Sequence, residues 1–475
     1  MTPQTPGVQT PGVRCPSRRA AGAAATRSFP TGDGVGFTRR RALSAGAVGT
    51  AGAVLAACGS GRDTATTTPA QQPATIVWMT DWTGGARGEA SKLSIPAFQE
   101  QYPTIKLDMQ ATDGNSFEAL SAHLAAGTLG DVVFINSTFF ELFAERGVFM
   151  DVGPLLQKYR FNRDSVWWES QYFEHKGKTH GLPYQFGIGT WVYNKDWFQR
   201  DGVPPPTDAW TTDDLLAAGQ KLVHRADNKW GADLKVEPNS TWIWFWANGV
   251  DLTEGRPPQI KSVLDQPKQL EVLQYCVDMI NRYQVAPSLY GQKAVKGLSF
   301  ANGDFAVSTS TAPKSLVSTI GAKFDWDIMP VPRWAGTKKR VTFWNHQAHM
   351  ITKAGEQRGH GEAATQFAIW MCGEGGMTFV AKTGGSTPVN KKIALSPVYL
   401  EGKPANLKTQ LDMLDRKANQ DVRGWKLWPS EVPWEAAVKA VLQQGFAGEI
   451  SVREMATQAT RAGDAALIAA GDLKR

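Results

Sequence analysis

Short β-rich runs alternate with stretches of helical spacing from residue 75 onward, and this order constrains the fold most strongly. Strands are expected at 75–79, 105–109 and 131–135, and helices at 89–102, 116–126 and 139–146. The run 131–135 is hydrophobic at almost every position, as in a strand that is covered on both faces. A strand–helix order repeated in this way predicts an α/β lobe with a mostly parallel sheet.

The rest of the chain is too long to close around the same core. A chain of 475 residues normally divides into two or more lobes. Further strands are expected at 190–193, 305–308, 324–329 and 342–352, and further helices at 211–225, 266–283, 362–372, 375–382, 406–414, 433–443 and 451–470. The sequence thus predicts an α/β protein with more than one lobe.

The positive charge of the chain is concentrated near its start. The formal net charge is +7, but residues 1–57 contain seven Arg and one acidic residue, whereas 58–475 contains 44 basic and 43 acidic residues. A nearly neutral body offers no basic surface of the kind that binds nucleic acid. We therefore expect no nucleic-acid partner.

The basic leader, 1–57, has the order of an export signal. Arg39 and Arg40 form a twin-arginine pattern, an Ala/Gly-rich run follows at 42–57, and Leu-Ala-Ala precedes Cys58. The run is too short and too poor in large apolar residues for a comfortable membrane span. Leu-Ala-Ala-Cys resembles the bacterial lipobox, which implies cleavage before Cys58 and a lipid anchor on its thiol. The alternative is a buried Ala-rich helix with a structural Cys.

Polar composition separates this leader from the body. Residues 58–74 are rich in Thr, Gly, Gln and Pro and are expected to form a flexible tether.

In the body, Cys276 and Cys372 each lie in an apolar helical run and are expected to be buried. An exported protein would permit a disulfide between them, and their spacing leaves that question open.

Six stretches, in order, resemble the extracellular solute-binding proteins of ABC importers, in particular the sugar-binding group that includes the maltodextrin binders. The most specific is Gly-Lys-Thr-His-Gly-Leu-Pro-Tyr at 177–184, followed by Tyr-Asn-Lys-Asp-Trp-Phe at 193–198. The others lie at 125–133, 204–216, 300–307, 326–332 and 385–389, and the resemblance covers about residues 75–475. One departure is Gly130, which stands where the family usually has Pro.

The resemblance implies the two-lobed, type II periplasmic-binding-protein fold, an α/β architecture in which hinge-linked lobes close on a ligand in the cleft between them. Lobe 1 would comprise 75–184 and 333–388, and lobe 2 would comprise 185–332 and 389–475. The permease subunits of an ABC importer would recognise the closed form.

A sugar site needs flat aromatic platforms beside polar groups of fixed direction, because sugars present both C–H faces and hydroxyls. The chain has 18 Trp, none of them before Trp78. The resemblance also implies a helix around 241–246, so that only some of its three Trp would face ligand. It implies ligand contacts from Asp81, Trp82, Asn136, Tyr184, Phe186, Trp242, Trp244, Trp344, Asn345, Ser386 and Trp434.

Known catalytic motifs are missing from the sequence. It contains no P-loop, Gly-x-Ser-x-Gly or His-Glu-x-x-His. His346 and His349 would lie on opposite faces of a strand, which disfavours a shared metal ion. His175 and His180 flank a Gly-Lys turn and are expected to face solvent. We therefore expect no enzyme activity, no metal and no cofactor, with a secreted glycoside-processing enzyme as the enzymatic alternative.

Together, these features favour a monomeric lipoprotein on the outer face of the cytoplasmic membrane. It would capture a mono- or oligosaccharide and deliver it to an ABC permease. The near-neutral body and the many Trp favour a neutral sugar. Two alternatives stay open, a non-sugar solute such as glycerol phosphate and an adhesion or scaffolding lipoprotein.

Overall fold

The computed structural model describes residues 73–112, 117–417, 419–424 and 431–474. Arg39, Arg40 and Cys58, which carry the predicted export signal and lipid anchor, lie outside the described residues. The same holds for Ser116, the expected start of a helix.

The first sheet contains the three strands expected at the start of the body. Its order is β14-β13-β3-β1-β2, and β6 pairs with β13 as well. The strands are β1 (Ala74–Thr80), β2 (Ile105–Ala111), β3 (Val132–Asn136), β6 (Gly181–Ile188), β13 (Arg340–Ile351) and β14 (Gln420–Arg423). β1 is parallel to both β2 and β3, so the parallel sheet predicted from the strand–helix order is confirmed. β13 runs antiparallel to β3 and to β6.

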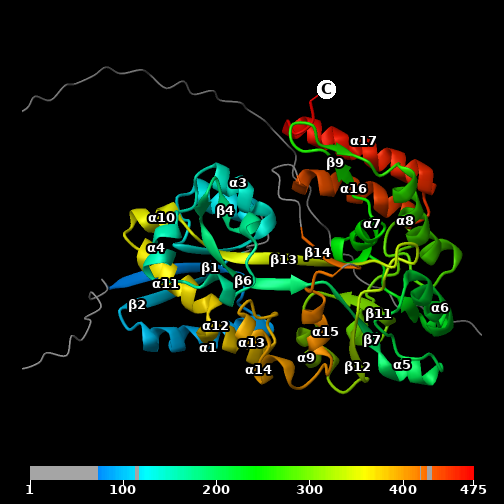
Figure 1. The fold of residues 1–475 in the computed structure, drawn as a ribbon, viewed down its shortest axis with the longest axis horizontal. Coiled ribbons are helices and arrows are strands. Elements are labelled where there is room, and N and C mark those ends of the chain that lie inside the picture. Colours follow the sequence, from blue (N-terminus) through cyan, green and yellow to red (C-terminus); the bar gives the residue numbers. More distant parts are fainter. Residues whose placement is uncertain (1–72, 113–116, 418, 425–430, 475) are drawn as a thin grey trace, which may run out of the picture. The chain divides into compact units, whose positions relative to one another are not determined.

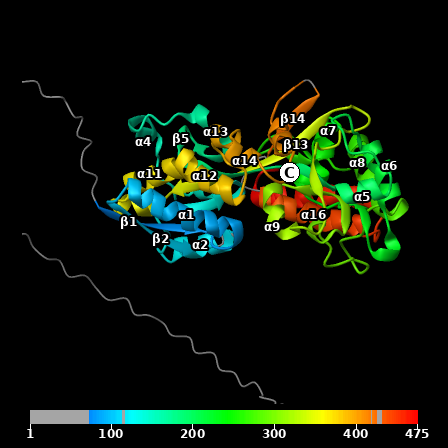
Figure 2. The same ribbon diagram turned by 90° about the horizontal axis from the view of Figure 1, so that it is seen from below.

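Helices pack on this sheet and form lobe 1 with it. α1 (Gly85–Gln101), α11 (Gly361–Cys372) and α12 (Glu374–Thr383) contact one another and lie side by side in Figures 1 and 2. The ring of Phe367 lies 5.2 Å from that of Trp78 and 5.1 Å from that of Phe98, so aromatic side chains fill the space between α1, α11 and β1. Smaller helices are α2 (Phe117–Ala125), α3 (Phe140–Glu145), α4 (Gly153–Lys158) and α10 (Lys353–Gln357).

A second sheet, of order β12-β7-β11-β8, forms the centre of lobe 2. Its strands are β7 (Thr190–Asn194), β8 (Trp230–Ala232), β11 (Phe305–Ser310) and β12 (Trp326–Met329). The surrounding elements are α5 (Lys195–Arg200), α6 (Thr212–Leu222), α7 (Ile243–Ala247), α8 (Pro267–Val277), α9 (Leu316–Ile320), α15 (Leu407–Asp412), α16 (Glu431–Phe446), α17 (Val452–Ala470), and the short pair β9 (Thr253–Glu254) and β10 (Lys261–Ser262). Thr211 and Asp214 form a capping box at the start of α6, which confirms the predicted cap.

The edge of each lobe at which its parallel strands end is called its carboxyl edge. The strands that join the lobes bring the two carboxyl edges together. β6 is parallel to β3, because both are antiparallel to β13, and it extends past the end of β3 as far as Ile188. Gly189 then connects β6 to β7. In lobe 2, Ser310 at the carboxyl end of β11 pairs with Thr190 at the start of β7, and β8 is parallel to β11. The segments that follow β1, β3, β8 and β11 therefore all lie at the junction of the lobes.

The chain passes between the lobes again through β13 and once more after α14. α13 (Lys391–Ala394) and α14 (Pro397–Leu400) still pack on α12 of lobe 1. The chain reaches lobe 2 at Asn406, whose backbone and side-chain amides both donate to Asp327 at 2.9 Å. The helices of 391–400 thus contact lobe 1, and the predicted lobe boundaries at 184, 332 and 388 stay predictions.

One expectation about exposure was wrong. His175 and His180 are only 9% and 6% exposed. The hairpin of β4 (Glu174–His175) and β5 (Lys178–Thr179) packs against α3, which covers His175, and His180 Nδ1 lies 2.9 Å from the carbonyl oxygen of Met150. A turn motif alone does not show which neighbouring element will cover it.

The open question of a disulfide is resolved by the structure. Cys276 and Cys372 are buried, as expected, but both are free and belong to separate hydrophobic clusters.

Within the described part of the chain, no helix is both long enough and apolar enough to cross a membrane.

Candidate functional site

The lobe 1 side of the junction is built on the loop after β1. Trp82 is fully buried, its ring lies 4.6 Å from that of Tyr184, and its Nε1 donates to Gln185 Oε1 at 3.2 Å. The guanidinium of Arg87 lies 5.4 Å from the centre of the Trp82 ring, and its Nη1 lies 3.9 Å from Asp81 Oδ2. This edge therefore combines an aromatic face, a carboxylate and a cation.

Asn136 lies on the same edge, at the end of β3. It is half-buried, and its Oδ1 accepts a hydrogen bond from the backbone N–H of Thr138 at 3.1 Å. The adjacent Ser137 is fully buried. β1 and β3 are parallel neighbours, so the residues that follow them lie at the same end of the sheet.

The lobe 2 side carries a group of charged residues after β8. Asp233 accepts from the Ser308 hydroxyl at 2.8 Å and pairs with Lys235 Nζ at 2.8 Å. Burial raises the pKa of the Glu237 carboxyl and that of Glu435 in α16. The charge of Asp233 adds to the rise at Glu237, and the charge of Glu237 adds to the rise at Glu435. Lobe 2 thus presents carboxyl groups that protonate more readily than exposed ones.

The joining strands have a polar face, made of Gln185, Gly187, Asn345 and Gln347. Gly187 pairs with Asn345 and Gln185 pairs with Gln347 across β6 and β13. Asn345 Oδ1 accepts from the backbone N–H of Gly187 at 3.2 Å. A Cβ atom at Gly187 would lie 2.6 Å from that oxygen and 3.1 Å from Thr311 Cβ, so a side chain here would displace the Asn345 amide and crowd Thr311 of lobe 2.

The opposite, aromatic face of the same strands is made of Phe186, Trp344 and His346. The rings of Phe186 and His346 stack at 5.4 Å, and the rings of Trp344 and His346 lie 4.8 Å apart. Tyr172 and Phe173 close this face, with rings 5.1 and 5.7 Å from that of His346. His346 is fully buried, and neither ring nitrogen has a hydrogen-bond partner within the described residues. This face is packed like a protein core.

The sequence-derived residues therefore separate into groups. Asp81, Trp82 and Asn136 lie on the lobe 1 edge, and Asn345 lies on the polar face between the lobes. Phe186 and Trp344 belong to the aromatic face, and Ser386 supports it by donating its hydroxyl to the Phe186 carbonyl at 3.4 Å. Tyr184 lies behind Trp82, with its ring stacked on His349 at 4.0 Å.

The Trp-rich run of lobe 2 is helical, as expected. It forms a π-helical turn, Pro238–Trp242, followed by α7. Trp244 packs on Trp191 at 5.8 Å and on Tyr275 at 5.3 Å, inside the hydrophobic cluster that also contains Trp242. Trp246 Nε1 donates to Asp251 at 3.3 Å.

Trp434 lies deeper in lobe 2. Its Nε1 donates to Ser262 Oγ at 3.0 Å, and its ring approaches Gly463 of α17. These two contacts of Trp434 are with β10 and α17.

Three polar residues at the junction were not singled out from the sequence. Gln185 accepts from Trp82, Thr311 lies beside Gly187, and Asn239 lies beside Gly189. Gln185 lies in an otherwise apolar strand, and this isolated polar residue was the available signal. Asn239 lies in the π-helical turn before α7 and Thr311 in the loop after β11, and only the fold brings these distant positions to the junction.

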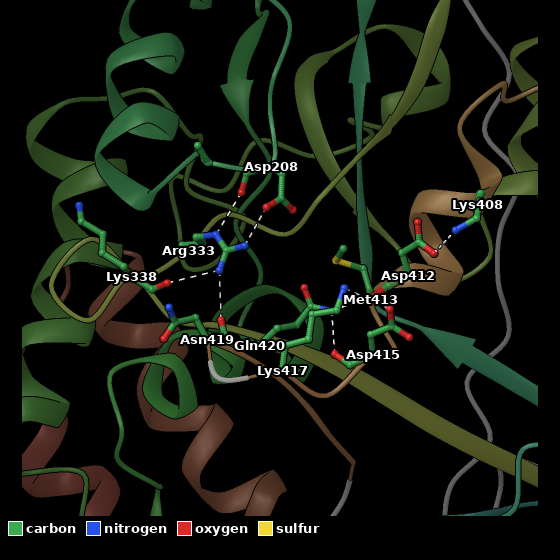
Figure 3. Close-up of a pocket in the computed structure, with 11 residues that line it drawn as sticks. Asp208, Arg333, Lys338, Lys408, Asp412, Met413, Asp415, Lys417, Asn419 and Gln420 are labelled. Atoms are coloured by element: carbon green, nitrogen blue, oxygen red, sulfur yellow. Dashed lines mark hydrogen bonds and ion pairs between the residues drawn. The ribbon is translucent and has the colours of Figure 1, made fainter.

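A separate cavity of about 830 Å³ lies where β13 and β14 begin (Figure 3). Arg333 crosses it and donates to Asp208 at 2.8 Å and to the carbonyl oxygen of Asn419 at 3.1 Å. Lys408 pairs with Asp412, and Lys417 lies 3.2 Å from Asp415. The charged side chains of this cavity are thus largely paired with one another.

Comparison with known families and curated proteins gives a consistent result. The family model for bacterial extracellular solute-binding proteins matches residues 94–406. Binding proteins of Brucella abortus (strain 2308) and Brucella suis biovar 1 (strain 1330) are 23% identical over 210 residues, which is 42% of this chain and 49% of theirs. The chain thus spans about half the length of these curated relatives.

Solved structures share the fold over a larger part of the chain. The substrate-binding protein Lmo0181 of Listeria monocytogenes, in complex with cycloalternan, is 21% identical, with a TM-score of 0.73 over 84% of this chain and 99% of that one. The cyclic α-maltosyl-1,6-maltose binding protein of Arthrobacter globiformis is 20% identical, with a TM-score of 0.65 over 83% and 99%. UgpB of Mycobacterium tuberculosis, in complex with glycerophosphocholine, is 16% identical, with a TM-score of 0.68 over 84% and 99%. The two-lobed fold is thereby confirmed.

Proposed function

The chain belongs to the bacterial extracellular solute-binding proteins, and we propose that it captures a mono- or oligosaccharide outside the cytoplasmic membrane for an ABC importer. The polar face between the two carboxyl edges is the observation that carries this proposal. Gln185 and Asn345 offer directed amides, and Trp82 offers an indole beside them. Amides and aromatic rings are the groups that bind sugar hydroxyls and C–H faces.

We assign the first ligand contacts to the lobe edges and to the polar face. Asp81, Trp82 and Asn136 would act from lobe 1, Asn239 and Thr311 from lobe 2, and Asn345 from between them. Phe186 and Trp344 would support the ligand-binding strands from behind, because their rings pack against His346 and its neighbours. The contacts predicted for Trp242, Trp244 and Trp434 stay predictions.

The sugar assignment draws on the proteins that share the fold. Two of them bind the cyclic saccharides cycloalternan and cyclic α-maltosyl-1,6-maltose. The binding of glycerophosphocholine by another favours a glycerol phosphate compound as the second candidate. Arg87 could meet a phosphate at the lobe 1 edge, but it already lies near Asp81. The near-neutral body favours the sugar.

The proposal includes a route to the membrane and a partner. The twin-arginine pattern at Arg39 and Arg40 would direct export, and Cys58 would carry the lipid anchor. Two acyl chains give stable membrane attachment where one chain is marginal. A monomer anchored in this way would deliver its sugar to the permease subunits by closing and reopening the lobes.

Intrinsic tryptophan fluorescence of the purified protein against a solute panel tests this function. The panel contains maltotriose, mannobiose, cycloalternan and glycerophosphocholine, and each mixture is then analysed chromatographically. We expect a saturable shift with at least one saccharide and recovery of that saccharide intact. A shift with glycerophosphocholine alone would favour the second candidate. Release of new reducing ends would show a glycoside-processing enzyme instead.

A further inference from the structure

A buried histidine of the β4–β5 hairpin faces two carboxylates of α3, away from the proposed sugar site. Lys176 and Gly177 form the two-residue turn of the hairpin, with φ of 49° and 76°, as in a type I′ turn. β4, which ends at His175, packs on α3. Glu141 and Glu145 lie four residues apart on the same side of that helix. The three side chains can bring one ligand atom each within 4.8 Å of one another.

The hydrogen bond at one ring nitrogen fixes the state of the other. His175 Nδ1 lies 2.9 Å from Glu141 Oε1, and a carboxylate can only accept, so Nδ1 carries the proton. In the neutral ring, Nε2 then carries a free lone pair and can only accept. This atom is buried and has no hydrogen-bond partner within the described residues, and His175 is only 9% exposed.

The nearest group to that lone pair is a second acceptor. Glu145 Oε1 lies 3.5 Å from His175 Nε2, which is too long for a good hydrogen bond. Lys176 Nζ donates to the other oxygen, Oε2, at 2.7 Å, so Oε1 is the oxygen of Glu145 that faces His175 Nε2. Two acceptors that face each other in this way call for a cation between them.

We propose that His175 Nε2 and the Glu145 carboxylate bind a divalent transition-metal ion of the Zn²⁺ class, with Glu141 as the positioning residue for the imidazole. Bonds of about 2.1 Å to both atoms, with the atoms 3.5 Å apart, enclose an angle of about 113°, close to tetrahedral. A carboxylate that accepts from the far nitrogen of a metal-binding histidine is the usual supporting arrangement. Imidazole as a ligand favours Zn²⁺, Co²⁺ or Ni²⁺ over Ca²⁺ or Mg²⁺.

The competing occupant is a second proton. An imidazolium would donate from both nitrogens, to Glu141 and to Glu145. Its other neighbours would be the Lys176 cation, which pairs with Glu145, and the ring of His180, 6.5 Å away. The 3.5 Å separation already fits an ion bonded to both atoms, whereas a good hydrogen bond would need Nε2 and Oε1 to approach to below about 3.2 Å.

Calorimetric titration of the purified, EDTA-treated protein with ZnCl₂ at neutral pH tests the site. We expect one ion per chain, and at least a tenfold loss of affinity in both His175→Ala and Glu145→Gln. The matched control is His224→Ala, which removes a half-exposed histidine that pairs with Asp201 at 2.7 Å, and it should bind Zn²⁺ as the wild type does. Thermal unfolding in EDTA verifies that each variant is folded.

A second measurement distinguishes the metal from the proton without any variant. In ¹⁵N NMR of the wild type, added Zn²⁺ should shift Nε2 of His175 while Nδ1 keeps its proton. A His175 that stays protonated on both nitrogens with Zn²⁺ present would overturn the proposal. So would Zn²⁺ binding that is equal in His175→Ala and the wild type, or absent at 1 mM metal. None of these results depends on which solute the protein carries.

Discussion

The two faces of the joining strands differ sharply although they alternate residue by residue along β6 and β13. The polar face carries Gln185, Gly187, Asn345 and Gln347, and the aromatic face carries Phe186, Trp344 and His346. Asn345 is half-buried, whereas His346 and Phe186 have no exposed surface. One pair of strands therefore offers hydrogen-bonding groups on one side and a packed core on the other.

This difference explains how a strand can both carry a site and hold two lobes together. Aromatic packing fixes the position of the strands, because Phe186, His346 and Tyr172 fill the space with few rotatable groups. Fixed strands give the amides on the other side a constant direction. We therefore expect changes on the aromatic face to reduce stability and changes on the polar side to reduce affinity.

The largest expected effect is a loss of stability in acid. Burial lowers the pKa of His346 and of His349 to about 3 from the usual 6.5. Below pH 6.5 the unfolded chain binds protons that the folded chain does not, so stability is full above that pH and falls as the pH drops towards 3. Each histidine contributes about 1.4 kcal/mol per pH unit, or about 4 kcal/mol over the range. Urea denaturation between pH 7 and pH 4 measures the slope.

The variant His346→Phe isolates the contribution of the aromatic face. It should make the slope shallower by about 1.4 kcal/mol per pH unit. Replacement of the half-exposed His224 by Phe is the control and should leave the slope nearly unchanged. An identical slope in His346→Phe and the wild type would show that His346 is reachable by protons in the folded state.

The next largest effect is expected from Phe186→Ala. Phe186 is fully buried, and its ring packs on His346 and, at 5.0 Å, on Trp167. Removing a buried Phe side chain costs about 3–5 kcal/mol of unfolding free energy. Denaturant titration should detect this loss, while the sugar affinity of the folded protein changes less than about threefold. A tenfold loss of affinity at unchanged stability would place Phe186 in direct contact with ligand.

A smaller effect is expected from Trp82→Phe on the lobe 1 edge. The change keeps an aromatic ring but removes the indole N–H that donates to Gln185. The loss of one such bond at the site, about 1 kcal/mol, should weaken sugar binding about fivefold. Trp78→Phe is the matched control, because the Trp78 indole donates to His349 inside lobe 1. Equal affinities for the two variants would remove Trp82 from the proposed site.

Much of the fold could be predicted from the sequence. The parallel strands β1, β2 and β3 follow from the local alternation of strands and helices, and the start of α6 follows from Thr211, a residue type that favours the N-cap position. The helical form of the Trp-rich run followed from the family resemblance and is confirmed. These features depend on neighbours in the sequence.

The site was less predictable, because it depends on register and on contacts over long sequence separations. Gln347 and Ala348 of β13 pair with Gln185 and Pro183, so Tyr184 is an extra residue in β6. Tyr184 can therefore lie with Trp82 while Phe186 lies on the aromatic face. No alternation pattern reveals such a bulge. His175 is covered by α3, whose Glu141 lies 34 positions earlier, so its burial could not be read from the turn beside it.

The most direct measurement is a calorimetric titration of wild type and Asn345→Ala with the sugar that shifts tryptophan fluorescence. We expect one sugar per chain and at least a fivefold weaker Kd in Asn345→Ala, at nearly unchanged stability. Asn248→Ala is the control, because Asn248 bonds Lys268 and Glu271 inside lobe 2, and its Kd should equal that of the wild type. No heat with any saccharide in the wild type, or the same Kd in Asn345→Ala, would contradict sugar capture at the polar face.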